Sequence, residues 1–221
     1  SDISPLADLS IFKLRELYLN HNTVEDLSPL ASLISLRDLR VEDNLINDIG
    51  ALAYLPALET LLLDDNLISD ISPVSGLTKL GKLDPWPTPI EGTIGGPSSV
   101  IREGVRVCLG LSGNGISDIS PLAQNPGLGN DEGIDLRGSP LSAESLHIYI
   151  PQMQANGVEF LYDALPGDAN NDGEINALDI TKVERIIAGL DYETPGADTN
   201  QDGSINAQDI TKVERLIAGL D

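Results

Sequence analysis

The first part of the chain repeats its pattern every 22 residues. Three short stretches, LRELYLNHN, LRDLRVEDN and LETLLLDDN, each end in an asparagine, at Asn22, Asn44 and Asn66. Leucine or valine occupies the first, fourth and sixth positions of each stretch, and an aspartate follows four residues after each asparagine. A coil of this kind cannot bury its apolar side alone, so neighbouring coils must stack around one continuous core. The repeat therefore predicts a solenoid with one short strand per coil.

The pattern L-x-x-L-x-L/V-x-x-N resembles the leucine-rich repeat, and its period is similar to that of bacterial internalin-like proteins. The resemblance implies an α/β leucine-rich-repeat solenoid with a parallel sheet on its concave face and irregular or 3₁₀ segments on the return path. We expect each asparagine to satisfy backbone groups at the turn. The last coil carries Ser139 at the asparagine position. A helical stretch at residues 143–156, kinked or broken at Pro151, and a final strand at residues 158–162 would then cap the core.

The repeat register breaks after the third coil. A fourth strand is expected to begin at LTKLGKLD, but three prolines within residues 85–89 rule out a regular ladder strand there. The distance from Asp70 to Asp118 is 48 residues, which we interpret as two repeats with a four-residue excess. We therefore expect an irregular coil with a protruding loop at about residues 84–104. Trp86 in this loop would either fill a gap in the distorted coil or anchor a protein or glycan partner.

The chain begins with Ser-Asp-Ile-Ser-Pro-Leu, a phrase that elsewhere lies between repeats. An N-terminal cap is therefore expected to be missing, and we expect the chain to be a fragment of a longer protein.

A second duplication occupies the C-terminus. Residues 168–191 recur as residues 198–221, and 19 of the 24 paired positions are identical. Each copy places oxygen-bearing side chains at loop positions 1, 3, 5, 9 and 12, with glycine at position 6, where a sharp turn disfavours a Cβ. A hard divalent ion needs about six to eight oxygen ligands, which such a loop supplies from alternate residues. Helix-capping turns alone would explain only one or two of these positions.

The two loops therefore predict that the chain binds two Ca²⁺ ions. The expected ligands in the first loop are Asp168, Asn170, Asp172, the Glu174 backbone carbonyl, Asn176 directly or through water, and Asp179. Those in the second loop are Asp198, Asn200, Asp202, Ser204, Asn206 and Asp209.

Each loop runs into a segment with an apolar stripe at helical spacing. The stripes consist of Ile180, Val183, Ile187 and Leu190 in the first copy and Ile210, Val213, Ile217 and Leu220 in the second. Pro-Gly before each loop prevents an entering helix, so the unit is a loop with one exiting helix. A calmodulin-like opening of a helix pair is therefore not expected. A core of about 55 residues is small, and bound calcium would help to stabilise it.

Residues 167–221 resemble a dockerin, the duplicated half-EF-hand module that docks onto cohesin domains in cellulosome-like assemblies. The resemblance implies a small all-α calcium-binding domain at residues 166–221, after a leucine-rich repeat domain at residues 1–165. It also implies cohesin contact through loop positions 10 and 11 and the exposed face of each helix. These positions are Ala177, Leu178, Lys182 and Arg185 in one half and Ala207, Gln208, Lys212 and Arg215 in the other.

Two features bear on those docking positions. The Ser-Thr pair of the family's type I pattern is absent at positions 10 and 11, so the cohesin class stays open. The basic residues could also belong to a solvated helix face. Ile-Thr-Lys-Val-Glu-Arg is identical in both copies, which favours function, although a recent duplication would explain it too.

Composition excludes several other classes of function. With 13 basic and 35 acidic residues the net charge is −22, which argues against nucleic acid or an anionic membrane as the main partner. No run of 18 apolar residues is present, so membrane insertion is not expected. Cys108 is the only cysteine and is expected at an outward strand position. A catalytic thiol would need a histidine base, and His21 and His147 fall at a repeat turn and in the cap, so we expect no enzyme.

The concave sheet would present a mixed polar surface that is typical of protein recognition. The residues expected to contact a partner there are Tyr18, Arg40, Glu42, Leu62 and Asp64. The surface has no clustered carboxylate pair of the kind that glycoside hydrolysis requires, although Glu16, Asp38 and Asp64 leave that alternative open.

Our leading hypothesis is a non-catalytic secreted adaptor at the cell surface or outside the cell. Its repeats would bind an unknown protein or glycan ligand, and its dockerin would attach it through calcium to a cohesin-bearing scaffold. One alternative is an adhesion or surface protein whose calcium module caps the solenoid and binds no cohesin. A third is an appendage of an enzyme whose catalytic domain lies upstream.

Overall fold

The computed structural model describes residues 1–11, 14–82, 100–129, 132–163, 165–170 and 174–220 of the 221-residue chain. The chain divides into two compact units. The first comprises residues 1–145 and 149–162, and the second comprises residues 146–148 and 163–221. Each unit is described by itself.

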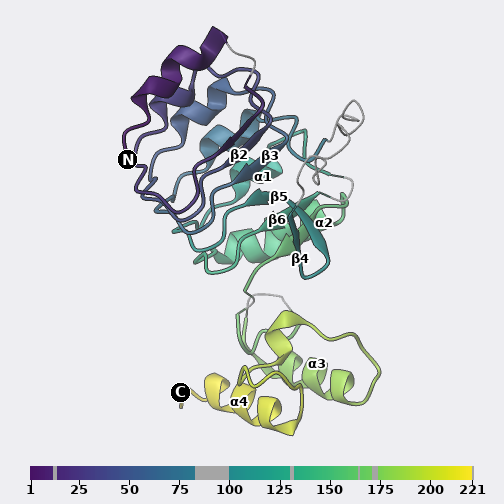
Figure 1. Cartoon of the computed structure of the whole chain (residues 1–221). Coiled ribbons are helices and arrows are strands. Elements are labelled where there is room, and N and C mark those ends of the chain that lie inside the picture. The colour runs from purple at the N-terminus through teal and green to yellow at the C-terminus, as the bar shows by residue number, and fades with distance from the viewer. Residues whose placement is uncertain (12–13, 83–99, 130–131, 164, 171–173, 221) are drawn as a thin grey trace, which may run out of the picture. The chain divides into compact units, whose positions relative to one another are not determined.

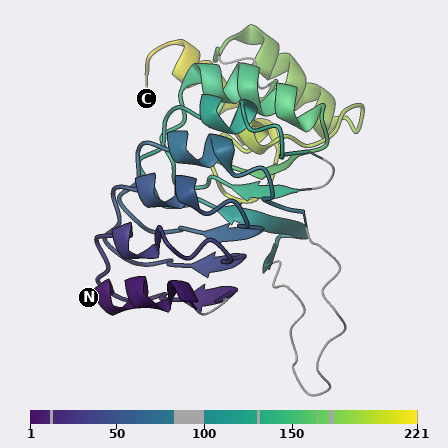
Figure 2. The same ribbon diagram turned by 90° about the horizontal axis from the view of Figure 1, so that it is seen from above.

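The first unit is a stack of coils that each contribute one strand to a single sheet (Figures 1 and 2). The parallel strands follow the order β1 (Glu16–Tyr18), β2 (Asp38–Arg40), β3 (Thr60–Leu62), β5 (Val105–Gly110), β6 (Gly133–Asp135) and β7 (Glu159–Leu161). Strand β4 (Val100–Arg102) pairs antiparallel with β5. The predicted leucine-rich-repeat solenoid with a parallel sheet is confirmed.

Short helical segments return the chain on the side opposite the strands (Figure 2). They are η1 (Ser4–Ile11), η2 (Ser28–Leu30), η3 (Gly50–Tyr54), η4 (Ser72–Gly76) and α1 (Ser120–Ala123). All but α1 are 3₁₀ helices, as the repeat predicts. An aspartate fixes the start of several turns: the Asp26 carboxylate, for example, accepts the Ser28 N–H at 2.7 Å. Residues paired across neighbouring strands, such as Leu39, Leu61 and Leu109, are fully buried between these two sides.

The repeat asparagines form a buried ladder along one edge of the stack. Asn66 is 6% exposed, and its Nδ2 donates to the Val41, Leu63 and Asp64 carbonyls at 3.0–3.1 Å. Its Oδ1 accepts the Ile46 N–H at 3.0 Å. Asn44 and Asn114 make the same set of bonds in their own coils. Each asparagine therefore joins its own coil to the preceding one, as expected.

The interpretation of the register break is wrong. Strand β3 pairs directly with β5, and Asn114 Oδ1 accepts the N–H of Ile68, the bond that the next coil in the stack should make. The 48-residue distance from Asp70 to Asp118 is therefore one 22-residue repeat plus an insertion of 26 residues (48 − 22 = 26). The stretch LTKLGKLD starts the next coil in register, because the Gly81 N–H donates to the Glu59 carbonyl as the Glu59 N–H does to the Arg37 carbonyl. The described residues of this stretch form no strand, and Gly81 lies in a turn.

Part of the segment that was expected to be an irregular loop is ordered sheet. Val100–Arg102 forms β4, and a tight turn at Glu103 (φ 50°) and Gly104 (φ 86°) leads into β5. Gly104 suits this turn, because its two central positions both have positive φ. Trp86 and the prolines lie outside the described residues.

The cap contains a helical stretch and a final strand, as predicted, but Pro151 does not break the helix. A π-helix over Ser145–Tyr149 leads into α2 (Ile150–Gln154), and the Ile150 N–H donates to the Ser145 carbonyl. Pro151 follows in the first turn of α2 and has no N–H to continue this series of bonds, and the helix changes there from π to α geometry.

The second unit contains α3 (Ala177–Ile187), η6 (Pro195–Ala197) and α4 (Ala207–Ile217). The two helices pack against each other around Ala169, Val183, Ile186 and Ala197. The predicted stripe is partly wrong: Ile187 and Leu190 are 45% and 67% exposed, and Ile186 is buried instead. Leu190 lies beyond the last helical residue, because Gly189 (φ 67°) ends the helix in a left-handed turn.

None of the helices in the described part of the chain is both long and apolar enough to cross a bilayer.

Candidate functional site: the duplicated loops and the concave face

The second duplicated loop winds around its first carboxylate. The Asp198 side chain accepts the N–H groups of Asp202 and Gly203 at 3.1 and 2.9 Å. Asn200 Oδ1 accepts the Asp202 N–H at 2.9 Å, and Asp202 Oδ1 accepts the Ser204 N–H at 3.0 Å. Gly203 has a φ of 85°, which is the conformation for which glycine was predicted. The oxygens at positions 1, 3 and 5 therefore all bond backbone within one tight loop.

The acids at position 12, Asp179 and Asp209, join each loop to its helix. Both are fully buried. One oxygen of Asp209 accepts the Asn200 N–H at 3.1 Å, and the other accepts the Asn206 N–H at 2.8 Å. Asn206 Oδ1 in turn accepts the Gln208 N–H at 2.8 Å, which completes a capping box at the start of α4.

The first loop repeats this arrangement where it is described. Asp179 accepts the N–H groups of Asn170 and Asn176 at 3.0 and 2.8 Å, and Asn176 caps α3 through the Leu178 N–H. Asp168 at position 1 is 1% exposed, whereas Glu174, expected to act through its backbone carbonyl, is exposed. Asp172 lies outside the described residues.

The donor set of the loops fits a hard cation. Every ligand atom in this set is an oxygen, and a carboxylate or amide oxygen that accepts one N–H keeps a second lone pair for a metal ion. Oxygens of this kind are what Ca²⁺ requires. Among the described residues, however, no three His, Cys, Asp or Glu side chains lie close enough together to form a metal cluster. The carboxylates of Asp179, Asp198, Asp202 and Asp209 are instead bonded to backbone N–H groups of their own loops.

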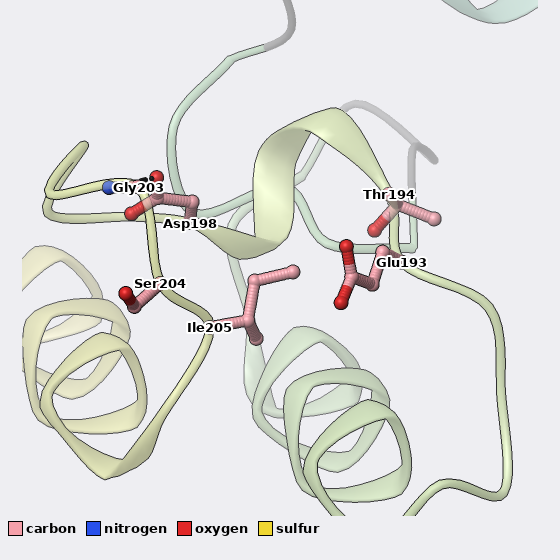
Figure 3. Close-up of a pocket in the computed structure, with 6 residues that line it drawn as sticks. All are labelled: Glu193, Thr194, Asp198, Gly203, Ser204 and Ile205. Carbon is pink, nitrogen blue, oxygen red and sulfur yellow. Dashed lines mark hydrogen bonds between the residues drawn. The ribbon is translucent and has the colours of Figure 1, made fainter.

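A pocket of about 410 Å³ adjoins the second loop (Figure 3). Asp198, Gly203, Ser204 and Ile205 line it from the loop, and Glu193 and Thr194 line it from the chain that leads into η6. Thr194 is held there because its hydroxyl donates to the Ala169 carbonyl at 2.7 Å. The two halves of the second unit are thus joined beside the loop.

The predicted docking positions lie at the exposed starts and outer faces of the two helices. Ala177, Leu178, Ala207 and Gln208 are exposed, and Leu178 is 62% exposed. The sequence prediction missed Asp191. One of its oxygens lies 3.0 Å from Lys182 Nζ and 3.3 Å from Arg185 Nε, and the bond from Lys182 lowers the pKa of Asp191 most.

The second helix holds its basic residues differently. Arg215 Nη2 donates to the Leu220 carbonyl at 3.1 Å. Lys212 lines a pocket of about 570 Å³ together with Leu165, Pro166 and Ile175. The two nearly identical helices therefore present their cations in different settings.

The concave face is open and polar at its N-terminal end. Tyr18 is half-exposed, and its hydroxyl lies 2.9 Å from Glu16 Oε2 and 3.3 Å from Asp38 Oδ2. The Arg40 guanidinium lies 4.9 Å from the centre of the Tyr18 ring and also bonds Asp38 at 3.2 and 3.3 Å. Glu42 is partly buried beside this group.

Farther along the sheet the concave residues are covered. Arg102 of β4 bonds Asp64 through two nitrogens at 2.7 and 2.8 Å, and one of them also lies 2.7 Å from Asp135. Leu62 is fully buried and Asp64 is 4% exposed, so neither of these two predicted contact residues offers an accessible surface. The sequence signal that could have predicted β4, and with it the bonds of Arg102, is the Glu-Gly turn at residues 103–104, flanked by strand-like residues.

Cys108 does not lie at an exposed position, so that prediction is wrong. It is 4% exposed at an irregularity between β5 and β6, and burial raises the pKa of its thiol to about 12. A thiol held so firmly protonated is a poor nucleophile.

Comparisons with known proteins identify both parts of the chain. Residues 166–218 match the model of the dockerin type I domain, and residues 13–54 match that of leucine-rich repeats (2 copies). Dockerin type I domains bind calcium. No curated protein matches the chain.

Solved structures match the repeat fold. Internalin C2 from Listeria monocytogenes str. 4b F2365 is 24% identical, with a TM-score of 0.53, over 73% of this chain and 56% of that one. Internalin InlF of the same strain is 29% identical, with a TM-score of 0.48, over 73% of this chain and 45% of that one. This chain therefore spans only about half the length of these relatives. The chain combines leucine-rich repeats with a C-terminal dockerin type I domain.

Proposed function

We propose that this chain is a non-catalytic secreted adaptor. Its repeats, at residues 1–165, bind a protein or cell-surface ligand, and its dockerin, at residues 166–221, attaches it to a cohesin-bearing scaffold when two Ca²⁺ ions are bound. The observation that carries the proposal is the dockerin match at residues 166–218. Leucine-rich repeats and dockerins are non-catalytic modules, and dockerins are generally extracellular or cell-surface modules.

The loops supply the calcium ligands in this proposal. Side-chain oxygens at positions 1, 3, 5, 9 and 12 of each copy, with the backbone at position 7, would hold one ion per loop. In the second loop Asp198, Asn200, Asp202 and Asp209 already bond backbone groups of the same short segment. The bound ion would neutralise these acids and fix the loop against its helix.

The helix faces supply the docking surface. Lys182 and Arg185 on α3 and Lys212 and Arg215 on α4 are the only basic residues of residues 166–221, against 12 acidic ones. A cohesin surface that complements these cations would recognise either helix, and charge complementarity would also orient the encounter.

The test is capture of the full chain by a panel of immobilised cohesin domains in calcium or in EGTA. Capture by at least one cohesin in calcium, and its loss in EGTA, are expected. Replacing Lys182, Arg185, Lys212 and Arg215 together by alanine should abolish capture. Lys79→Ala, an exposed lysine of the repeats, is the matched control and should leave it unchanged. Absent or EGTA-resistant capture would contradict the tether and favour a module that only caps the solenoid.

A further inference from the structure

One row of the concave face contains two buried acceptor atoms that no described residue satisfies. Asn20, Glu42 and Asp64 occupy equivalent positions at 22-residue spacing, two residues beyond the aligned Tyr18, Arg40 and Leu62. The backbone continues this alignment, because the His21 N–H donates to the Glu42 carbonyl and the Asp43 N–H to the Asp64 carbonyl. The three side chains therefore stand side by side on adjacent coils.

These three residues differ in how their oxygens are satisfied. Asp64 accepts bonds from Arg102, from the Ser112 N–H at 3.0 Å and from the Ser112 hydroxyl at 2.6 Å. Asn20 Oδ1 and Glu42 Oε2 are also buried, yet neither has a hydrogen-bond partner in the part of the chain that the structure describes. A buried acceptor without a donor destabilises a protein, so each exception calls for an explanation.

The surrounding charges indicate what kind of group is missing. The open end of the face carries the acids Glu16, Asp38 and Glu42 beside Arg40, whose guanidinium is already engaged with Asp38 and Tyr18. Arg102, the next cation along the sheet, is engaged with Asp64 and Asp135. Burial raises the pKa of Glu42 most, and the nearby charge of Asp64 raises it further. The acceptors therefore favour a ligand that brings both N–H donors and positive charge.

A guanidinium meets this requirement better than an ammonium does. Its planar fork presents several N–H donors in fixed directions, so one group can bond two acceptors on neighbouring coils. Rotation about the last side-chain bond of Glu42 exchanges its two oxygens, so a donor arriving from the concave side can meet either of them. The exposed ring of Tyr18 lies on the same open surface and offers a flat apolar contact.

We infer that the open end of the concave face binds an arginine side chain of a protein partner, with the guanidinium donating to Glu42 and Asn20. This inference rests on the proposed recognition role of the repeats and specifies the chemistry of their ligand. It places the contact on the first two coils and not on the region that Arg102 covers from Asp64 onward.

The experiment is an NMR titration of the ¹⁵N-labelled full chain in calcium with the peptide Ac-Gly-Arg-Gly-NH₂. We expect saturable shifts at Asn20, Glu42 and Tyr18. The peptide Ac-Gly-citrulline-Gly-NH₂ has the same shape without the charge and should bind about tenfold more weakly, since one charge-assisted bond of this strength corresponds to that factor. Equal binding of the two peptides would overturn the inference.

Two variants locate the site. Glu42→Gln should reduce arginine-peptide affinity about tenfold, and Asn20→Ala should reduce it severalfold. Glu25→Gln removes the same charge from an exposed position on a repeat turn and should change nothing. Equal losses in Glu42→Gln and Glu25→Gln would show only general attraction to an acidic chain. Should Glu42→Gln fail to fold, Asn20→Ala and the two peptides still decide the question.

The same variants separate this inference from the tether. Glu42→Gln should be captured by cohesin domains as well as the natural sequence is, because the dockerin occupies residues 166–218. If Glu42→Gln loses peptide binding but is still captured by cohesin domains, the substitution has affected the repeats alone. Failed cohesin capture with intact peptide binding would reject the tether and leave the arginine site standing.

Discussion

At the scale of single residues, the asparagine ladder shows how one side chain satisfies several backbone groups. Asn66→Ala would leave the Val41, Leu63 and Asp64 carbonyls without that donor and the Ile46 N–H without its acceptor. We expect a loss of about 3 kcal/mol or more in the free energy of unfolding, because each buried unsatisfied group costs roughly 1–3 kcal/mol. Urea denaturation of the full chain in calcium measures the loss. Asn47→Ala, at an exposed position of the neighbouring turn, is the matched control, and an equal loss there would contradict the ladder's role.

Glu42 gives the opposite expectation, that a substitution stabilises the fold. Its pKa is raised in the folded state by burial, so its ionised form opposes folding. Below the ordinary glutamate pKa of about 4.3 the carboxyl is protonated in the folded and unfolded states, so its burial carries no charge penalty. This penalty to folding grows as the pH rises from the ordinary pKa through the raised pKa of the folded state. Glu42→Gln should therefore raise the midpoint of thermal unfolding more at pH 7 than at pH 4.

Calorimetry of the natural chain and the Glu42→Gln variant at both pH values checks this expectation. Glu25→Gln reports the effect of removing one negative charge from an acidic chain, and the gain from Glu42→Gln at pH 7 must exceed it. A loss of stability at pH 7 would mean that Glu42 supports the fold and does not serve a ligand.

At the scale of elements, each duplicated loop and its helix depend on one buried carboxylate. Asp209 bonds the N–H groups of Asn200 and Asn206 through separate oxygens, so it joins loop positions 3 and 9 to the first turn of α4. Asp209→Asn replaces one acceptor by an NH₂ group, which cannot accept the N–H it would face. We expect calcium binding at the second loop to weaken at least tenfold and α4 to exchange its amide hydrogens faster.

Isothermal titration with calcium and hydrogen exchange over Ala207–Ile217 test this expectation. Glu214→Gln, an exposed acid on the same helix, is the control for lost charge. Unchanged calcium binding in Asp209→Asn would remove position 12 from the ligand set. Faster exchange in α3 as well would show that the two halves unfold together.

Sequence pattern predicted those elements whose signal is local. The Asn66 ladder and the glycine at loop position 6, Gly203, each follow from a short motif that fixes its own backbone. The pattern failed where pairing over a long distance decided the outcome. The 48-residue spacing suited either two short repeats or one repeat with an insertion, and only the pairing of β3 with β5 distinguishes them. The burial of Leu62 likewise depends on tertiary context that its strand pattern does not contain.

At the scale of the whole molecule, the two units have separate cores and different sources of stability. The repeat unit buries a continuous series of leucines and isoleucines, whereas the described buried apolar residues within residues 163–221 of the second unit are Ala169, Val183, Ile186, Ala197 and Val213. The two candidate sites were predictable to different degrees, because one is built from a single stretch of sequence and the other from residues of different coils. The calcium loops are contiguous in sequence, so their ligands could be named, but the unsatisfied Glu42 and Asn20 emerge only when coils stack.

Calcium removal should therefore act on one unit only. A ligand that binds the folded state at 100 times its dissociation constant adds about 2.7 kcal/mol per site, which is large for a small core. We expect EGTA to lower the midpoint of one calorimetric transition and to speed exchange in Ala177–Ile187 and Ala207–Ile217, while exchange around Leu39 and Leu61 stays slow. Sodium chloride at matched ionic strength controls for screening of the −22 net charge. If both transitions fell together in EGTA, the repeats and the dockerin would fold as one cooperative unit, and the loops would stabilise the whole chain.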